Sequence, residues 1–203
     1  YPNLDQVTFR FMGNSAEIYD ALQRGEIHLA SQTTLVASDY ITDMLNPPVT
    51  STVELLWTNH SVWEHTDFGI LPADSRYIFF DDPQVRRAVA YALDRQRIIN
   101  EAWYGLGTPL NSYVPDTHPL YKTSFVTYPY SPTLAADLLT AAGWVDTNSN
   151  GIRDKGGQEF VITYSTTTAP QRIQAGLIVA ENLAAVGIDV VLDFQPPAQF
   201  FAD

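Results

Sequence analysis

The chain has 203 residues, of which 45% are hydrophobic and 17% charged, and this composition is typical of a globular protein with one substantial core or two small ones. Its 23 acidic and 11 basic side chains give a formal charge of −12, which argues against a nucleic-acid partner and against an electrostatic hold on anionic lipid. The sequence contains no cysteine, so disulfides and thiolate chemistry are excluded, and no apolar run approaches the length of a membrane span.

The N-terminal part of the chain predicts a strand, a helix and a second strand. Residues 7–11 alternate apolar and polar side chains, which is the period of a half-buried strand. Ser15 is a predicted helix cap and Gly25 a predicted stop, so the residues between them are expected to be helical. Residues 27–29 resume the strand alternation. Farther along, the sequence predicts a short helix and two more strands: residues 40–45, 52–57 and 62–68.

The stretch from Phe79 to Gly105 predicts two helices joined end to end. Asp82 is placed to cap the first helix, and Pro83 follows at a position where no donor is lost. Asp94 is placed to cap the second helix, and Gly105 supplies its stop. Four apolar residues of the first helix recur at the spacing of one helical face: Val85, Ala88, Val89 and Ala92.

Charged side chains of both signs are concentrated in the same stretch. Its basic residues are Arg86, Arg87, Arg95 and Arg97. Its acidic residues are Asp81, Asp82 and Asp94. Because the two signs are interspersed, we expect local ion pairs here and not a binding patch.

The C-terminal half predicts a long loop, a helix and a strand–helix–strand unit. Residues 105–118 are rich in Gly and Pro and are expected to form an ordered loop. A helix is predicted from Ser131, its cap, to Gly143, its stop. Residues 160–165 and 188–194 alternate as strands on either side of a helix predicted over residues 170–187. We expect these two strands to be parallel, with a right-handed crossover.

The first helix of the pair carries the run Asp82-Pro83-x-Val85-Arg86-x-Ala88-x-Ala90-Tyr91-Ala92-x-Asp94-Arg95. This run resembles a signature of the extracellular solute-binding proteins of family 5, the peptide-, sugar- and nickel-binding components of ABC importers. Residues 21–27, 63–69 and 130–144 resemble further segments of that family. The chain departs from the family pattern at His28, Gly69 and Ser131, where Asp, Asn and Asp are usual.

The resemblance implies a mixed α/β fold, namely a lobe of the type II periplasmic-binding-protein kind that is similar to domain III of dipeptide- and oligopeptide-binding proteins. Residues 1–203 are then expected to form a single, partial C-terminal lobe of a larger solute-binding protein. Two such lobes would close over a solute by a hinge.

The implied function is the capture of a small solute, either a peptide, a sugar or a metal chelate, and its delivery to the permease subunits of an ABC importer. No enzymatic activity is expected. No signal peptide is recognisable, and we expect the chain to be an internal piece of a longer protein. The implied location is extracytoplasmic, either in the periplasm or as a cell-surface lipoprotein.

The candidate ligand-binding residues lie where a predicted strand ends. Residues 166–169 are predicted to form a polar loop between strand and helix, which makes Thr166, Thr167 and Thr168 candidates, because ligands bind beyond the carboxyl ends of strands in open α/β sheets. An ordinary turn and helix cap explains these threonines about equally well. Trp63 is a second candidate.

The segment from Asp146 to Gly151 resembles the first half of a calcium-binding loop, because oxygen ligands recur at Asp146, Asn148 and Asn150. Asp154 falls at the ninth loop position. Position twelve is Gly157, so the bidentate Glu of such loops is missing. We therefore expect an Asn- and Gly-rich turn without a bound metal or other cofactor.

Two alternatives to solute binding stay open from the sequence. An extracellular carbohydrate-active enzyme would need paired carboxylates, and Glu64 and Asp67 are candidates beside Trp63. A structural module clipped by calcium is the other alternative. The histidines are too scattered to predict a zinc site: His28, His60, His65 and His118.

Overall fold

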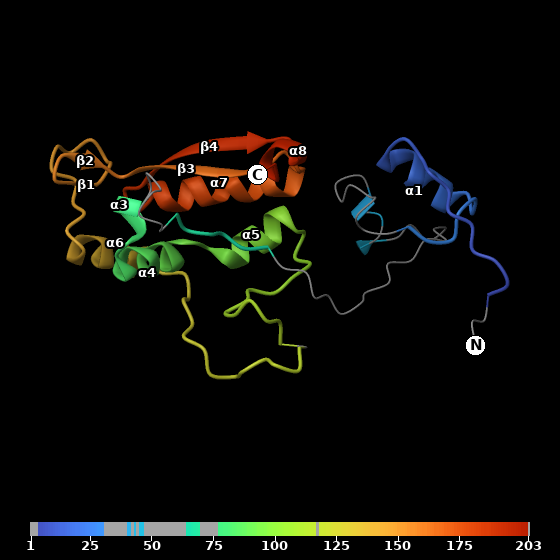
Figure 1. Ribbon diagram of the computed structural model, residues 1–203, viewed down its shortest axis with the longest axis horizontal. Coiled ribbons are helices and arrows are strands. Elements are labelled where there is room, and N and C mark those ends of the chain that lie inside the picture. The colour runs from blue at the N-terminus through green and yellow to red at the C-terminus, as the bar shows by residue number, and fades with distance from the viewer. Residues whose placement is uncertain are drawn as a thin grey trace. The chain divides into compact units, whose positions relative to one another are not determined.

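The computed structural model describes residues 4–30, 40–41, 43, 45–46, 64–69, 77–116 and 118–202. The chain divides into two compact units, Tyr1–Asn59 and His60–Asp203. Figure 1 shows the chain coloured from its N-terminus to its C-terminus. The assignment of all 203 residues to a single lobe stays a prediction.

The first unit is organised by helix α1, Ser15–Gln23. Its cap is Asn14, whose side chain accepts a hydrogen bond from the Glu17 N–H group, so the prediction that Ser15 is the cap is wrong by one position. Gly25 ends the helix with a φ of +69°, a conformation that favours glycine, as predicted. Tyr19 lies 6.1 Å from Tyr40, measured between ring centroids.

Two of the predicted strands of this unit are wrong. Residues 7–11 and 27–29 form no strand, and the side chains of Phe9 and Phe11 are 83% and 96% exposed. Alternation gives a segment one apolar side, but a strand also needs a neighbouring strand to bond its backbone groups. No such neighbour is present among the described residues of this unit. The short helix predicted over residues 40–45 is confirmed where the chain is described, whereas the strand over 52–57 lies outside the described residues.

In the second unit, the helix pair follows the sequence closely. Asp82 accepts a hydrogen bond from the Gln84 N–H group at 2.7 Å, and Asp94 accepts one from Arg97 at 2.9 Å, so both predicted caps are confirmed. Ser131 caps the later helix, also as predicted. The strand predicted over residues 62–68 is wrong where it is described, from Glu64 onward. The helices before residue 150 are α3, Tyr77–Phe80; α4, Pro83–Ala92; α5, Arg95–Ala102; and α6, Pro132–Ala141.

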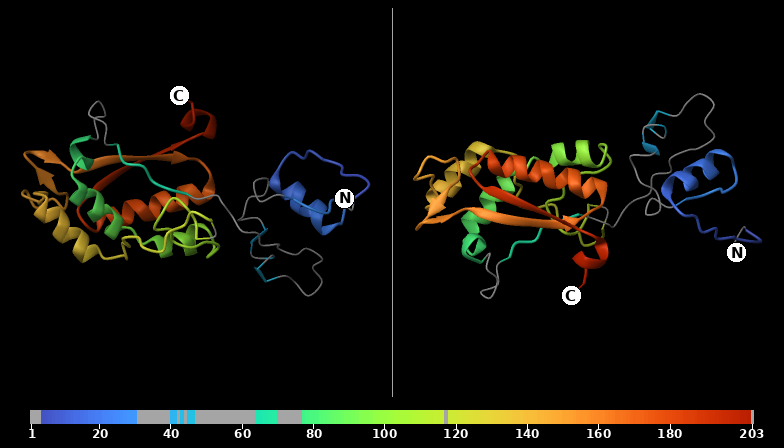
Figure 2. Two further views of the ribbon diagram at one scale, coloured as in Figure 1. Left: turned by 60° about the horizontal axis from the view of Figure 1, so that its bottom comes forward. Right: turned by 90° about the horizontal axis from the view of Figure 1, so that it is seen from above.

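The predicted strand–helix–strand unit is present as β3, α7 and β4. Strand β3, Val161–Thr167, pairs in parallel with β4, Asp189–Gln195, from Val161 opposite Asp189 to Thr167 opposite Gln195. Helix α7, Pro170–Ala184, covers one face of this pair (Figure 1, Figure 2). A Cβ atom at Gly176 would lie 3.0 Å from the Phe194 ring, so glycine lets the helix approach the sheet closely.

A short hairpin and a last helix complete the unit. Strands β1, Asp154–Lys155, and β2, Gln158–Glu159, are antiparallel. Their turn is Gly156-Gly157, with φ of +61° and +81°, which is the pair that two-residue hairpin turns favour. Helix α8 spans Pro197–Phe200.

The core of the second unit lies between the sheet with α7 and the layer of α4, α5 and α6. Phe160 is fully buried and stacks on Phe79 at a centroid distance of 4.9 Å, with Trp144 at 4.4 Å. All four predicted apolar positions of α4 are buried: Val85, Ala88, Val89 and Ala92. No helix in the described part of the chain is long and apolar enough to cross a membrane.

Among the described residues, the ion pairs predicted inside the helix pair do not form at Asp82 and Asp94. The carboxylates of Asp82 and Asp94 cap helices, and the Arg86 guanidinium donates to the backbone carbonyls of Phe80 and Asp81. Arg95 likewise donates to backbone carbonyls, and burial lowers its pKa. The starts of α4 and α5 and the end of α3 need such partners for their free backbone groups, and that need outweighs a surface ion pair.

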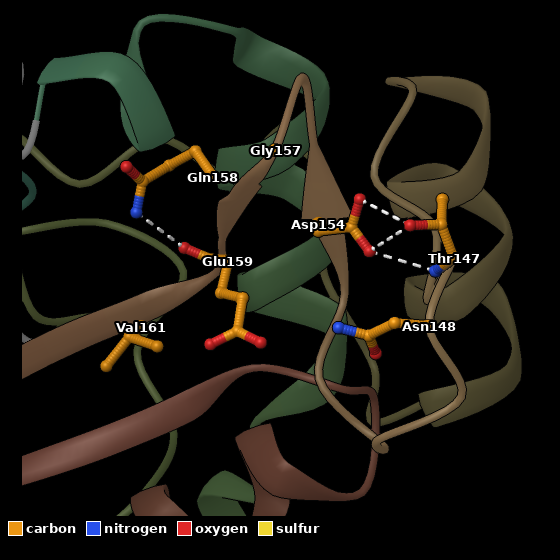
Figure 3. A pocket seen from close by; sticks show the side chains of 7 residues that line it. All are labelled: Thr147, Asn148, Asp154, Gly157, Gln158, Glu159 and Val161. Carbon is orange, nitrogen blue, oxygen red and sulfur yellow. Dashed lines mark hydrogen bonds between the residues drawn. The ribbon is translucent and has the colours of Figure 1, made fainter.

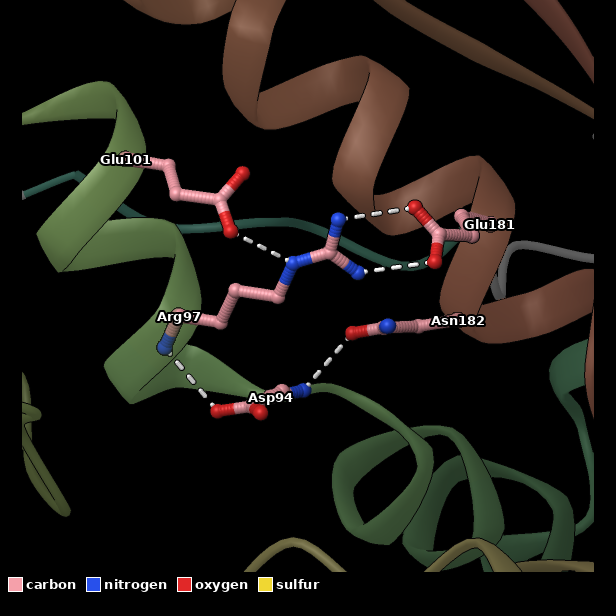
Figure 4. Close-up of polar contacts among 5 residues, drawn as sticks. All are labelled: Asp94, Arg97, Glu101, Glu181 and Asn182. Carbon is pink, nitrogen blue, oxygen red and sulfur yellow. Dashed lines mark hydrogen bonds and ion pairs between the residues drawn. The ribbon is translucent and has the colours of Figure 1, made fainter.

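Arg97 is the exception, and it joins α5 to α7 (Figure 4). Two of its nitrogens meet the two carboxylate oxygens of Glu181 at 2.9 Å each, and a third meets Glu101 at 2.8 Å. Beside this contact, Asn182 accepts a hydrogen bond from the Asp94 N–H group at 2.8 Å. The hydrogen bonds from Arg97 lower the pKa of Glu181.

Candidate functional site

The predicted ligand-binding threonines lie at the edge where β3 and β4 end and α7 begins. Thr166 and Thr167 belong to β3, so the prediction that the loop starts at residue 166 is wrong, and only Thr168 follows the strand. Thr166 is 8% exposed and Thr167 1% exposed, whereas Thr168 is exposed. The structure therefore brings all three to the carboxyl edge, but only Thr168 presents its side chain openly to solvent.

The hydroxyl group of Thr167 is the polar centre of this edge. It accepts a hydrogen bond from an Arg172 nitrogen at 3.3 Å and lies 3.5 Å from the Ala169 N–H group. No side chain caps α7, because its cap residue is Ala169 and its first residue is Pro170. The start of α7 is thus an edge where backbone N–H groups and one arginine face the end of the sheet.

Arg172 and Glu64 form an ion pair at the same edge. The sequence analysis predicted neither of them as a ligand-binding residue. The Nη2 and Nε atoms of Arg172 lie 2.8 Å and 3.3 Å from one Glu64 oxygen, Oε1. The pair joins residues 108 positions apart, so no local pattern predicts it. One sequence signal was available: Arg172 is the only basic residue after Lys155.

Further polar side chains follow the sheet toward this edge. Asp193 accepts hydrogen bonds from the Ser165 hydroxyl at 3.0 Å and from the Gln195 amide. Ser165 lies opposite Asp193, and Gln195 lies opposite Thr167, in the register of the two strands. The edge therefore offers hydroxyl, amide, carboxylate and guanidinium groups to a polar solute.

The other residues predicted for a site are Trp63 and the two carboxylates suggested for an enzyme, Glu64 and Asp67. Trp63 lies outside the described residues. Asp67 is 87% exposed and lies 3.2 Å from the ring of His65, while Glu64 pairs with Arg172. The two carboxylates suggested for an enzyme are thus engaged with different partners.

A hollow of about 410 Å³ lies at the other end of β3, beside the hairpin (Figure 3). Its lining is mostly polar: Thr147, Asn148, Asp154, Gly157, Gln158, Glu159 and Val161. Asp154 is 8% exposed, and its carboxylate accepts hydrogen bonds from the Thr147 hydroxyl at 2.7 Å and N–H group at 2.9 Å. The buried charge is therefore satisfied from within the protein.

The oxygens of the calcium-like loop are directed at the loop's own backbone. Asp146 accepts hydrogen bonds from the N–H groups of Gly151 at 2.9 Å and Asn150 at 3.2 Å. Asn148 accepts another from Asn150 at 3.0 Å. Across the described residues, no group of three or more acidic or histidine side chains is arranged to hold a metal ion. These contacts fit an Asn- and Gly-rich turn.

Comparison with known proteins places these features in a family. The family described as bacterial extracellular solute-binding proteins, family 5 Middle, matches residues 1–203. The oligopeptide-binding protein AppA of Bacillus subtilis is 28% identical over 196 residues, which cover 93% of this chain and 33% of AppA. The glutathione-binding protein GsiB of Salmonella typhimurium is 28% identical over 150 residues, which cover 71% of this chain and 26% of GsiB. The chain thus spans a third or less of these relatives.

Solved structures agree with the sequence comparison. The structure of AppA from Bacillus subtilis in complex with a nonapeptide has a TM-score of 0.69 and 24% identity, covering 92% of this chain and 35% of AppA. NikA from Brucella suis in complex with Fe(III)-EDTA has a TM-score of 0.55 and 31% identity, covering 59% of this chain and 24% of NikA. The predicted α/β fold of the type II periplasmic-binding kind is confirmed. The chain belongs to the bacterial extracellular solute-binding proteins of family 5.

Proposed function

We propose that this chain is part of the substrate-binding component of an ABC importer, which captures a peptide or another small solute and delivers it to a permease. The observation that carries the proposal is the polar edge at the carboxyl ends of β3 and β4, where Thr167, Thr168 and Arg172 lie together. Ligands of open α/β sheets bind at such edges. In the full-length protein, this edge would form one wall of the cleft that holds the solute.

The chemistry of the solute is not fixed by the family. AppA was solved with a nonapeptide, GsiB is a glutathione-binding protein, and NikA was solved with Fe(III)-EDTA. One scaffold thus serves peptides and a metal chelate, so the contacts at the edge must decide the specificity. In this proposal Thr168 and Trp63 contact the solute, and the buried Thr166 and Thr167 form the edge behind Thr168.

The location and the partners follow from the same proposal. Members of this family are extracellular or periplasmic components of importers. We place this protein in the periplasm or, as a lipoprotein, on the cell surface, with the permease subunits of an importer as its partners. The family is one of solute-binding proteins and not of enzymes, so the alternative of a carbohydrate-active enzyme has no support.

Calorimetry of the full-length protein against panels of peptides, sugars and metal chelates tests the proposal. Thr167→Val and Thr168→Ala should each weaken capture roughly five-fold, the effect of about one lost hydrogen bond. Thr163→Ala is the matched control, because Thr163 is an exposed threonine of the same strand, away from the edge. Equal losses in all three variants, or no binding to any panel, would contradict the proposal.

The 203-residue chain on its own should bind the same solute weakly. It spans a third or less of the relatives, and a ligand pocket usually buries about 70–90% of its ligand. One wall cannot supply that burial. Submicromolar binding by this chain alone would show that the cleft does not need a second wall.

A further inference from the structure

The sequence contains one Asn-Gly pair, Asn150-Gly151, and it lies in the exposed turn before the hairpin. In such a pair the backbone nitrogen of the glycine can attack the side-chain amide carbon of the asparagine, because glycine has no side chain that blocks the approach. Asparagine is accordingly among the residues that heat-stable proteins avoid. Both residues are exposed, so water reaches them. The pair has the chemistry of a deamidation site.

Deamidation of this pair would take place in two steps. A bond forms between the Gly151 nitrogen and Cγ of Asn150, the bond from Cγ to Nδ2 breaks, and the amide proton of Gly151 leaves with Nδ2 as ammonia. Water then opens the cyclic imide at either of its carbonyl groups, which leaves aspartate or isoaspartate at position 150. The amide donor of the asparagine is thereby replaced by a carboxylate, which can only accept hydrogen bonds.

The folded turn holds the Asn150 carboxamide at both of its ends. Nδ2 donates a hydrogen bond to Oε1 of Glu159 at 2.7 Å, and Oδ1 accepts one from the Ile152 N–H group at 2.8 Å. Ring closure requires the Gly151 nitrogen to approach the face of the carboxamide to within about 3–3.5 Å in a defined direction. A carboxamide that is fixed at both ends cannot turn to present that face without breaking these bonds.

The attacking nitrogen is restrained as well. The Gly151 N–H group donates to Oδ2 of Asp146 at 2.9 Å. The nitrogen must lose its proton to attack, and a negative charge is disfavoured beside a carboxylate. Asp146 therefore opposes the first step from the side of the nitrogen, as Glu159 opposes it from the side of the carboxamide.

Glu159 can hold the carboxamide because the hairpin fixes its position. It belongs to β2, pairs with Asp154 of β1, and lines the hollow beside the hairpin (Figure 3). Glu159 lies nine residues after Asn150, so their contact exists only while the hairpin is folded. Unfolding of the hairpin would release the carboxamide.

We propose that Asn150-Gly151 is a latent deamidation site that the folded protein keeps closed, with Glu159 holding the carboxamide and Asp146 holding the backbone N–H group. The inference does not depend on the solute. Deamidation would place a carboxylate against Glu159, where the amide now donates a hydrogen bond, so that two negative charges face each other. The product cannot restore the contact, and a hairpin that has opened long enough to react stays altered.

The experiment follows the conversion of amide to acid at position 150 by peptide mapping and mass spectrometry of the full-length protein in mildly alkaline buffer. Folded wild type should react about ten-fold more slowly, or slower still, than the same protein unfolded in urea, because the bonds to Glu159 and Asp146 must break first. Glu159→Ala should raise the rate in the folded protein about three- to ten-fold, the effect of one such bond. Gln158→Ala is the matched control on the same strand, because the Gln158 side chain donates to the Glu159 carbonyl and not to Asn150. It should leave the rate unchanged.

Three outcomes would overturn the inference or a part of it. Equal rates in folded and unfolded wild type would overturn it, as would equal rates in folded Glu159→Ala and Gln158→Ala. Asp146→Ala should also raise the rate; a lower rate would show that Asp146 takes the proton of the attacking nitrogen, and would overturn its assigned part. Circular dichroism before incubation shows whether each variant is folded.

A second measurement tests the Glu159 contact without relying on Glu159→Ala to fold. Asn150→Asp imitates one deamidation product and should lower the melting temperature by about 1–3 °C, because it sets two carboxylates against each other. Adding Glu159→Gln should remove this loss, since the opposing charge is gone. A melting temperature that Asn150→Asp leaves unchanged would overturn Glu159 as the group that holds the carboxamide.

Discussion

At the scale of single residues, Arg153 acts by closing the ends of two helices. Arg153 donates to the Val186 and Trp144 carbonyls at 2.7 Å each and to the Thr140 hydroxyl at 3.0 Å. Its guanidinium therefore lies beside the C-terminal ends of α6 and α7, where carbonyl groups lack helical partners and a cation is favoured. Burial lowers the pKa of Arg153, while Asp146 opposes that effect.

Replacing Arg153 by Met should destabilise the protein by about 2–3 kcal/mol, because buried carbonyls lose a charged donor. Arg153→Lys should cost less, since it keeps one donor and the charge. Arg87→Met is the control, because Arg87 is an exposed arginine on α4 and should change the free energy of unfolding by less than about 0.5 kcal/mol. Chemical denaturation measures all three. A loss at Arg153 no larger than at Arg87 would contradict the assigned role.

The Arg97–Glu181 pair predicts a dependence of stability on pH. Hydrogen bonds from Arg97 lower the pKa of Glu181 below its ordinary value of 4.5. The folded state therefore favours the charged carboxylate, so this contribution is complete above the unfolded pKa and is lost as pH falls through the lower, folded pKa.

Between about pH 5 and pH 3, the melting temperature of the wild type should thus fall more steeply than that of Glu181→Gln. The difference should be small, because the pair is exposed, and should shrink further in high salt. Melting curves across this range provide the measurement. Parallel curves for the two proteins would show that the pair does not stabilise the fold.

At the scale of elements, the sequence predicts the structure well wherever the signals are local. The caps Asp82, Asp94 and Ser131 were identified from sequence because a cap bonds to a backbone group only two or three residues away. The β3–α7–β4 unit was also predicted, because its strand and helix periods are unbroken. Strands 7–11 and 27–29 failed because pairing depends on a partner that alternation does not specify.

The candidate site, too, could be predicted from the sequence only where its signals are local. Thr167 and Thr168 were found because a strand end next to a helix start is visible in the sequence. The Arg172–Glu64 pair joins segments 108 residues apart, and nothing in either segment names the other. The lone arginine in an acidic C-terminal region was the only available hint.

The hydrogen bonds of the loop from Asp146 to Asp154 lead us to expect that calcium does not change the melting temperature. Its carboxylate and amide oxygens already accept backbone N–H groups, so a cation would have to displace bonds that hold the turn. Adding calcium or a chelator should leave the melting temperature unchanged. A ligand that binds only the native state must raise that temperature, so a calcium-dependent rise abolished by Asp146→Ala would prove the expectation wrong.

At the scale of the whole molecule, the main core cluster of the described residues belongs to the second unit. Every residue of the main core cluster lies between Phe79 and Ile188, including the fully buried Val85, Leu139 and Phe160. The first unit buries far fewer apolar side chains among its described residues, namely Tyr19, Ala21, Tyr40 and Ile41. Since apolar burial is the main source of folding free energy, the second unit should hold most of the stability of this chain.

A fragment of residues 60–203 should therefore fold on its own. The described residues of its main core cluster all lie between Phe79 and Ile188, so its melting temperature should lie within a few degrees of that of the whole chain. Near-ultraviolet circular dichroism should retain the signal of the packed Phe79, Trp144 and Phe160 rings. The matched control is Leu139→Ala in the same fragment, which empties a fully buried site and should cost about 2–5 kcal/mol. A fragment that melts without cooperativity, or that is indifferent to Leu139→Ala, would mean that residues 1–59 are needed to complete the core.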